Sequence, residues 1–156
     1  MEDYNKAISD LTQALKLNPP NPSTCHSIRG LCWRKLGNFE EALSDYGKCI
    51  EHHMTMYNAM SNVDSNATLE TRQLGARHYN NRAYCYAKLG RYREAIGDYS
   101  AAIQLDPMNS HAYHNRGTSY DKIGQGDLAI ADFTKVFFEF YLFLLTICLY
   151  TSLLTL

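Results

Sequence analysis

Apolar residues recur at helical spacing along most of this chain, and the pattern is clearest over residues 76–107. It predicts two short amphipathic helices joined by a tight turn. The first helix, residues 76–89, has one apolar face: Tyr79, Ala83 and Tyr86. The second helix, residues 93–105, has another: Ala95, Tyr99 and Ala102. Gly90 lies in the turn, where a residue without a Cβ can adopt the left-handed conformation that ends a helix.

The same helix-turn-helix pattern occurs three times. The turns have the sequences KLGNFEEAL, KLGRYREAI and KIGQGDLAI, and their matching alanines are Ala42, Ala95 and Ala129. The last two alanines are 34 positions apart, which is the period of the tetratricopeptide repeat. The first two are 53 apart, which is one period plus an insertion of 19 residues. On these residues the chain resembles the tetratricopeptide repeat (TPR) family over residues 1–136. The resemblance implies an all-α fold, an α-solenoid of antiparallel helix hairpins.

The repeats divide the chain into six parts. They are a half repeat at 1–20, a repeat at 23–53, an inserted extension at 54–75, a repeat at 76–109, an incomplete repeat at 110–136 and an apolar tail at 137–156. The half repeat supplies one helix with no helix before it to cover its apolar face. We therefore expect a piece or a variant of a longer array, in which this helix is loosely held.

No proline ends the helix that passes His53, so that helix can run on through the insertion. We interpret the insertion as two helix extensions around a polar loop at 61–66, and a disordered loop is the alternative. Asn66 or Thr68 is the expected capping residue of the second extension.

One charged pattern runs through the predicted core. Arg29, Arg82 and Arg116 occupy equivalent positions in the first helices of the repeats, and Asp45, Asp98 and Asp132 occupy equivalent positions in the second helices. An unpaired buried charge is very costly. We therefore expect each arginine to bind an aspartate with two hydrogen bonds, preferably within its own repeat. These pairs are interpreted as structural.

Composition and motifs argue against several classes of function. The formal net charge of −1 gives no overall basic field for nucleic acid. The sequence lacks a phosphate-binding glycine loop, an HExxH motif and a nucleophile elbow, so we expect no enzyme and no cofactor. His111 and His114 share a helix face, but two histidines do not complete a metal site. The five cysteines form no CxxC pair, and we expect reduced thiols: Cys25, Cys32, Cys49, Cys85 and Cys148.

The family resemblance also implies a binding surface. In TPR proteins the first helices line the concave face, where a partner's peptide lies. The partner-binding residues expected on this basis are Arg77, Asn80, Asn81, Tyr84, Lys88, His111, His114, Asn115, Thr118 and Lys122. The preceding repeat adds Thr24, Ser27, Leu31 and Arg34. The resemblance thus implies a non-catalytic, cytoplasmic module or scaffold for protein–protein interaction. An enzyme or RNA binder of which this chain is only a part is the alternative that the missing motifs and near-neutral charge oppose.

Some members of the family bind the C-terminal carboxylate of Hsp70 or Hsp90 with a clamp of five polar side chains. The five positions fall here on Ser27, Leu31, Asn81, His111 and Asn115. Only Asn81 matches, and both cations of the third repeat are missing. The sequence therefore argues against the Hsp70/Hsp90 tail as the partner.

The repeat pattern stops after Lys135, and Val136–Leu156 contains one charged residue, Glu139. Three interpretations remain open. In the first interpretation the segment is a membrane anchor, since 21 helical residues span about 31 Å, enough for the core of a bilayer. Alternatively, it is a helix that caps the last repeat, or an accidental terminus. The first interpretation makes the chain a tail-anchored membrane adaptor with cytosolic repeats, and this is the alternative function.

Overall fold

A computed structural model describes residues 2–60 and 65–138 of the chain. Within these residues the structure consists of helices and short turns, with no strands. The six labelled helices are α1 (Glu2–Lys16), α2 (Pro22–Leu36), α3 (Phe39–Met60), α4 (Ser65–Lys88), α5 (Tyr92–Leu105) and α6 (Ser110–Lys122). A further helix covers residues 126–138. The expected all-α solenoid is confirmed.

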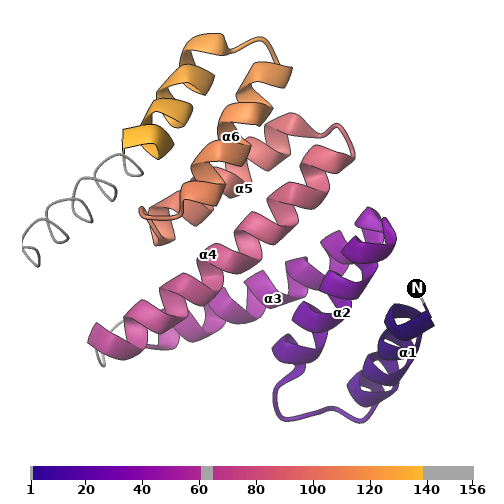
Figure 1. Cartoon of the computed structure of the whole chain (residues 1–156). Coiled ribbons are helices and arrows are strands. Elements are labelled where there is room, and N and C mark those ends of the chain that lie inside the picture. The colour runs from indigo at the N-terminus through magenta and orange to yellow at the C-terminus, as the bar shows by residue number, and fades with distance from the viewer. Residues whose placement is uncertain (1, 61–64, 139–156) are drawn as a thin grey trace, which may run out of the picture.

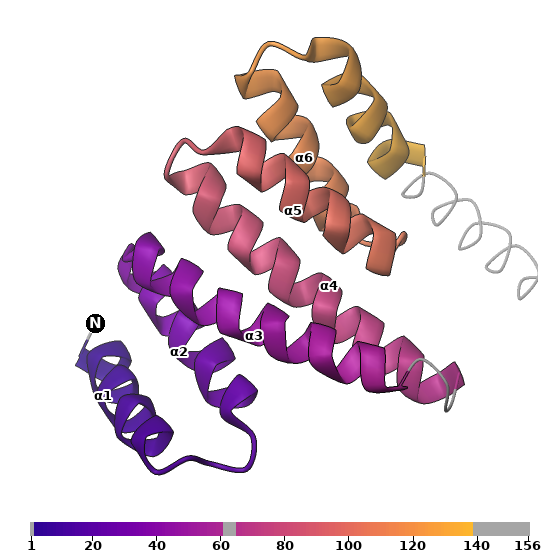
Figure 2. The ribbon, with the colours of Figure 1, turned by 180° about the vertical axis from the view of Figure 1, so that it is seen from behind.

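Consecutive helices run antiparallel and stack in the order of the sequence (Figures 1 and 2). Each labelled helix packs against the next, and α4 also contacts α6. The first helices of neighbouring hairpins therefore lie on one side of the stack. The 22-residue α3 and the 24-residue α4 are longer than the others, and their joined ends project beyond the hairpins on either side (Figure 1).

The three repeat turns share one backbone conformation. Gly37, Gly90 and Gly124 have φ values of 84°, 76° and 77°, in the left-handed region that glycine adopts without a Cβ clash. The residue after each glycine donates its amide to a carbonyl five residues earlier, as Arg91 does to Tyr86 at 2.9 Å. This bond satisfies a carbonyl that the end of the helix leaves open. The turn predicted at Gly90 is confirmed.

The core is built from small residues between large ones. Ala76, Ala83, Ala95, Tyr99, Ala102 and Ala112 form one buried cluster. Ala42, Leu43, Tyr46 and Cys85 form a second cluster under the preceding hairpin. Alanines let two helix backbones approach closely, and the rings fill the remaining volume. The two clusters place α4 at the centre of the stack, because it contributes residues to both.

The insertion extends two helices. α3 continues past His53 to Met60, and α4 begins at Ser65. The expected cap at Asn66 or Thr68 is wrong, because both residues lie inside α4. Serine, asparagine and threonine fit the first turn of a helix as well as its cap, so the sequence could not fix this boundary. Of the expected loop, residues 61–64 lie outside the described residues.

The last helix continues beyond the end of the repeat pattern. It reaches residue 138, three residues after Lys135. No helix within residues 2–60 and 65–138 is long and apolar enough to cross a membrane. The interpretations of the tail concern residues 139–156, which lie outside the described residues.

Candidate functional site

Each core arginine binds the aspartate of its own repeat. Arg82 donates from Nε and Nη2 to the two carboxylate oxygens of Asp98, at 2.7 and 2.8 Å. The guanidinium of Arg82 also lies over the rings of Tyr79 and Tyr86, with Cζ 5.7 and 5.8 Å from the centroids. The hydrogen bonds that Arg82 donates to Asp98 raise the pKa of Arg82 and so stabilise its charged form.

The other two hairpins contain the same bidentate contact. Arg29 and Asp45 meet at 2.7 and 2.8 Å, and so do Arg116 and Asp132. All three aspartates are buried. Each pair joins the two helices of one hairpin. Within each pair the arginine and the aspartate neutralise each other. They therefore hold the hairpins closed and are not available to a ligand.

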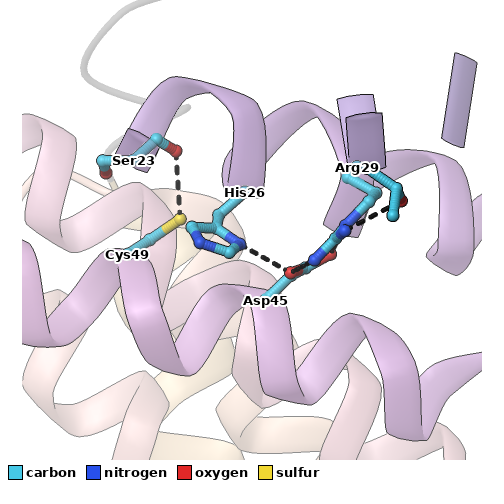
Figure 3. A network of polar contacts seen from close by, with 6 residues as sticks. Ser23, His26, Arg29, Asp45 and Cys49 are labelled. Atoms are coloured by element: carbon cyan, nitrogen blue, oxygen red, sulfur yellow. Dashed lines mark hydrogen bonds and ion pairs between the residues drawn. The ribbon is translucent and has the colours of Figure 1, made fainter. Parts of the chain in front are cut away.

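The first hairpin carries a polar network that combines a cysteine, a histidine and an aspartate (Figure 3). His26 stands where the other repeats have a tyrosine, and its Nδ1 lies 2.8 Å from Asp45 Oδ1. Cys49 donates its thiol to the carbonyl oxygen of Ser23 at 3.4 Å. Cys49 is fully buried, and burial raises the pKa of its thiol to about 11. A thiol that stays protonated is not a nucleophile, so this network is structural.

A pocket of about 330 Å³ lies between α4 and α6, over α5, and we call it the α4–α6 pocket. It is lined by Tyr84, Ala87, Lys88, Tyr92, Tyr99, Asn115, Thr118, Ser119 and Lys122. Five of the ten partner-binding residues expected from the sequence lie in it: Tyr84, Lys88, Asn115, Thr118 and Lys122. The side contact between α4 and α6 brings these residues together across two hairpins.

The charged side chains that line the α4–α6 pocket are all positive. Its lining contains two lysines and no carboxylate. Lys88 Nζ lies 5.3 Å from the centroid of the Tyr84 ring, and Arg34 Cζ lies 5.1 Å from the same centroid. Phe39 packs edge-on against this ring, at 6.5 Å between centroids. Two cations thus lie against the Tyr84 ring, and the pocket combines positive charge with aromatic surface.

A second pocket, of about 510 Å³, lies at the other end of α4, beside the start of α6. It is lined by Glu70, Gln73, Leu74, Arg77, Asn80, Asp106, Asn109 and His111. Three more of the expected residues lie here, namely Arg77, Asn80 and His111. Because the lining contains both acids and a cation, it has no single sign of charge.

A third pocket, of about 200 Å³, separates α2 from α4, and Thr24, Ser27 and Arg77 are among its lining residues. The two remaining expected residues, Asn81 and His114, line none of these three pockets. The ring of His114 lies 5.6 Å from that of Phe133. Of the five clamp positions, Ser27 and His111 fall in different pockets, and neither carries a permanent cation.

Two buried histidines were not expected from the sequence. His53 and His78 are 3% and 2% exposed, and Nδ1 and Nε2 of His53 and Nδ1 of His78 have no hydrogen-bond partner. Burial lowers both pKa values, to about 4 for His78, where the Arg77 charge adds to the effect. The burial of His53 could have been predicted from its position, because it follows the core residue Cys49 by four residues and so lies on the same helix face. No group of three or more possible ligand side chains in the described part of the chain is arranged for a metal ion.

Comparison with known families gives three matches to models described as tetratricopeptide repeat, at residues 1–48, 76–109 and 110–137. Among curated proteins, the chain is 33% identical over 85 residues to Hsp70-Hsp90 organizing protein 2 of Arabidopsis thaliana, covering 49% of this chain. It is 27% identical over 105 residues to heat shock protein STI1 of Saccharomyces cerevisiae, covering 67% of this chain. The chain spans 15% of the length of each of these relatives.

Solved structures show the same arrangement of helices. The second TPR of Spaghetti (RPAP3), bound to the HSP90 peptide SRMEEVD, has a TM-score of 0.59 and 28% identity, covering 74% of this chain and 90% of that one. BtubC from P. vanneervenii has a TM-score of 0.68 and 18% identity, covering 86% of this chain and 56% of that one. The likeness to BtubC is one of fold alone.

Proposed function

Because this chain belongs to the tetratricopeptide repeat family, we propose that it is a non-catalytic module that binds a segment of a partner protein on the face formed by α2, α4 and α6. One observation carries the proposal. Pockets occur side by side between these first helices, and they contain eight of the ten residues that the family resemblance assigns to binding. Polar side chains from different hairpins thus meet along one surface, as recognition of an extended segment requires.

The similar structure with a bound peptide supports this proposal. The second TPR of Spaghetti holds the HSP90 peptide SRMEEVD on a fold that matches 74% of this chain. The two curated relatives also have names that refer to chaperones. In our proposal this chain shares the use of a peptide groove with them, and it works in the cytoplasm, where its free cysteines would stay reduced.

The proposal does not include a carboxylate clamp. Ser27, Leu31 and Asn115 are uncharged, and His111 is not a permanent cation. A terminal carboxylate at these positions would meet the amides of Asn81 and Asn115 without a lysine or arginine, and charge-assisted bonds are the strong ones. The clamp positions therefore favour partner segments that are recognised along their length.

The test uses the full chain and the peptide SRMEEVD in its free and C-terminally amidated forms, with fluorescence anisotropy as the measurement. We expect amidation to leave any binding within about twofold, because none of the five clamp positions carries a permanent cation. Micromolar binding that disappears on amidation would show that a clamp exists. A peptide array probed with the same helical protein tests the module itself, and an array without a single bound peptide would refute it.

The apolar sequence Val136–Leu156 supports a second candidate, a membrane-tethered adaptor with the same repeats facing the cytosol. The candidates differ in location and not in the binding surface. A fluorescent protein fused ahead of the full chain distinguishes them in cells. Fluorescence on membranes that is lost when residues 137–156 are deleted supports the tether, and diffuse fluorescence in both cases removes it.

A further inference from the structure

The α4–α6 pocket has a chemical character that goes beyond a general peptide groove. Its floor is buried, since Tyr99 and Ser119 are 1% and 2% exposed. Its rim carries Lys88 and Lys122, which both lie in the last turn of their helices. Neither lysine forms an ion pair with a residue in the described part of the chain. Both ammonium groups are therefore without a carboxylate partner, although that of Lys88 lies over the Tyr84 ring.

The polar groups that line the pocket favour a ligand with negative charge. The hydroxyls of Thr118 and Ser119 donate to the carbonyl oxygens of His114 and Asn115, four residues earlier in α6. The other polar groups of the lining are the amide of Asn115, the two lysines and the hydroxyls of three tyrosines. Two cations with no lining carboxylate attract an anion and disfavour a cation.

The size and walls of the pocket favour a side chain over a free chain end. A volume of about 330 Å³ holds one extended side chain with the backbone on either side of it. The rings of Tyr84 and Tyr92 provide apolar walls for methylene groups. Lys88 follows the clamp position Asn81 by seven residues, which is about 10 Å along the helix. The pocket shares Asn115 with the clamp positions, and its two lysines lie about two helical turns beyond Asn81 and Asn115.

We infer that the α4–α6 pocket selects a glutamate or aspartate side chain inside the partner segment, which Lys88 and Lys122 bind from opposite sides. This inference rests on the proposed function and adds to it the class of partner: an acidic segment that needs no free C-terminus. The carboxylate lies between the two ammonium groups and accepts from the Asn115 amide. The side-chain methylenes pack on Tyr84. Since the ammonium groups are exposed at the rim, binding weakens as salt is added.

The experiment uses the full chain and an immobilised library of heptapeptides that are acetylated at the N-terminus and amidated at the C-terminus. We expect the bound peptides to share an acidic residue at one position. Replacing that residue by glutamine weakens binding about tenfold in anisotropy titrations. Lys88→Gln and Lys122→Gln each weaken binding of the acidic peptide about fivefold and leave binding of its glutamine counterpart unchanged. Lys35→Gln is the matched control, because this exposed lysine of α2 has the same charge but lines none of the three pockets.

The outcomes separate the inference from the proposed function. Bound peptides without a shared acid, or a loss that is equal in Lys35→Gln and Lys88→Gln, overturn the acidic pocket and leave the peptide module intact. Binding that requires a free C-terminus overturns it in favour of a terminal clamp. A library with no bound peptide, tested with protein whose circular dichroism is helical, overturns both. Lysines at the rim are exposed, so we expect the variants to fold normally.

Discussion

The junction between α3 and α4 and the junction between α5 and α6 join successive repeats with different polar contacts. At the α5–α6 junction, Arg116 donates from Nη1 to the hydroxyl of Ser100 at 3.0 Å, in addition to its bonds with Asp132. Arg29 likewise donates to Thr12 of α1. At the α3–α4 junction the equivalent position is Gly47, which has no hydroxyl to offer Arg82.

The α3–α4 junction is also the longer one, and it buries polar atoms at a cost in stability. It encloses His53 and His78, whose buried ring nitrogens lack partners. Gly75 lies directly against the His53 ring. A buried polar atom without a hydrogen bond loses its hydration and gains nothing in return. The α1–α2 and α5–α6 junctions thus each contain a hydroxyl that accepts from the arginine, whereas the α3–α4 junction lacks that hydroxyl and buries histidine ring nitrogens without partners.

The largest effect concerns the ion pair inside the hairpin that follows each junction. Asp98→Ala and Asp132→Ala each leave a partly buried guanidinium without its carboxylate, and we expect each to cost about 3 kcal/mol of unfolding free energy. Urea denaturation followed by circular dichroism measures both. Similar losses of unfolding free energy would show that the difference between the junctions does not come from these ion pairs. A cost under about 1 kcal/mol for either variant would mean that solvent already screens that pair.

Gly75→Ala tests the tight contact of the α3–α4 junction. A Cβ at this position would meet the His53 ring, so we expect a loss of about 1–3 kcal/mol from overpacking. Gly97→Ala in α5 is the control, because its Cβ would meet nothing within 4 Å. We expect that variant to gain up to about 1 kcal/mol from helix propensity. Equal effects in the two variants would contradict the close packing of His53.

The pH dependence of stability tests the same junction, because His78 is buried there. Its pKa is about 4 when folded, below the unfolded value of about 6.5, so the unfolded state binds the proton more tightly. The stability is complete above pH 6.5 and falls as the pH drops from 6.5 toward 4. We expect a loss of about 2 kcal/mol at pH 5. Denaturation at pH 7.5 and 5 measures it, and His78→Gln removes this loss if the assignment is right.

The smallest effects come from the hydroxyl that one junction has and the other lacks. We expect Ser100→Ala to cost about 0.5–1 kcal/mol, because Arg116 loses a bond while alanine favours the helix. At Gly47 an added Cβ meets nothing within 4 Å. We expect Gly47→Ser to gain about 1 kcal/mol and to equal Gly47→Ala, although serine is the poorer helix former. A serine variant clearly weaker than the alanine variant would show that no bond to Arg82 forms.

The parts of the fold that the sequence predicts are the periodic ones. The turn at Gly90 and the buried stripe of Ala95, Tyr99 and Ala102 follow from spacing alone, because a helix fixes which residues share a face. The start of α4 was misplaced because a capping residue and a first-turn residue have the same chemistry. The burial of His53 was missed because the repeat ends at this residue, and Gly75, which lies against its ring, belongs to the insertion, where no repeat fixes the register.

The site follows from the sequence only in part. The resemblance places Tyr84, Lys88 and Lys122 on the first helices, but their meeting in one pocket depends on how α6 lies against α4. Tyr92, Tyr99 and Ser119 line the same pocket, and only Tyr99 was placed from the sequence, on the apolar face of its helix. Such contacts depend on the rotation between hairpins, which no local pattern encodes. The binding roles themselves stay predictions.

The three arginine–aspartate bonds each connect residues that are 16 positions apart, and every labelled helix packs on its neighbour in the sequence. The search for native contacts during folding is therefore short, because each hairpin closes only a small loop of chain. Proteins with such local contacts fold in microseconds to milliseconds, and repeat arrays can start folding at more than one place. We expect a partly synthesised chain to close its first hairpins before the later ones are made.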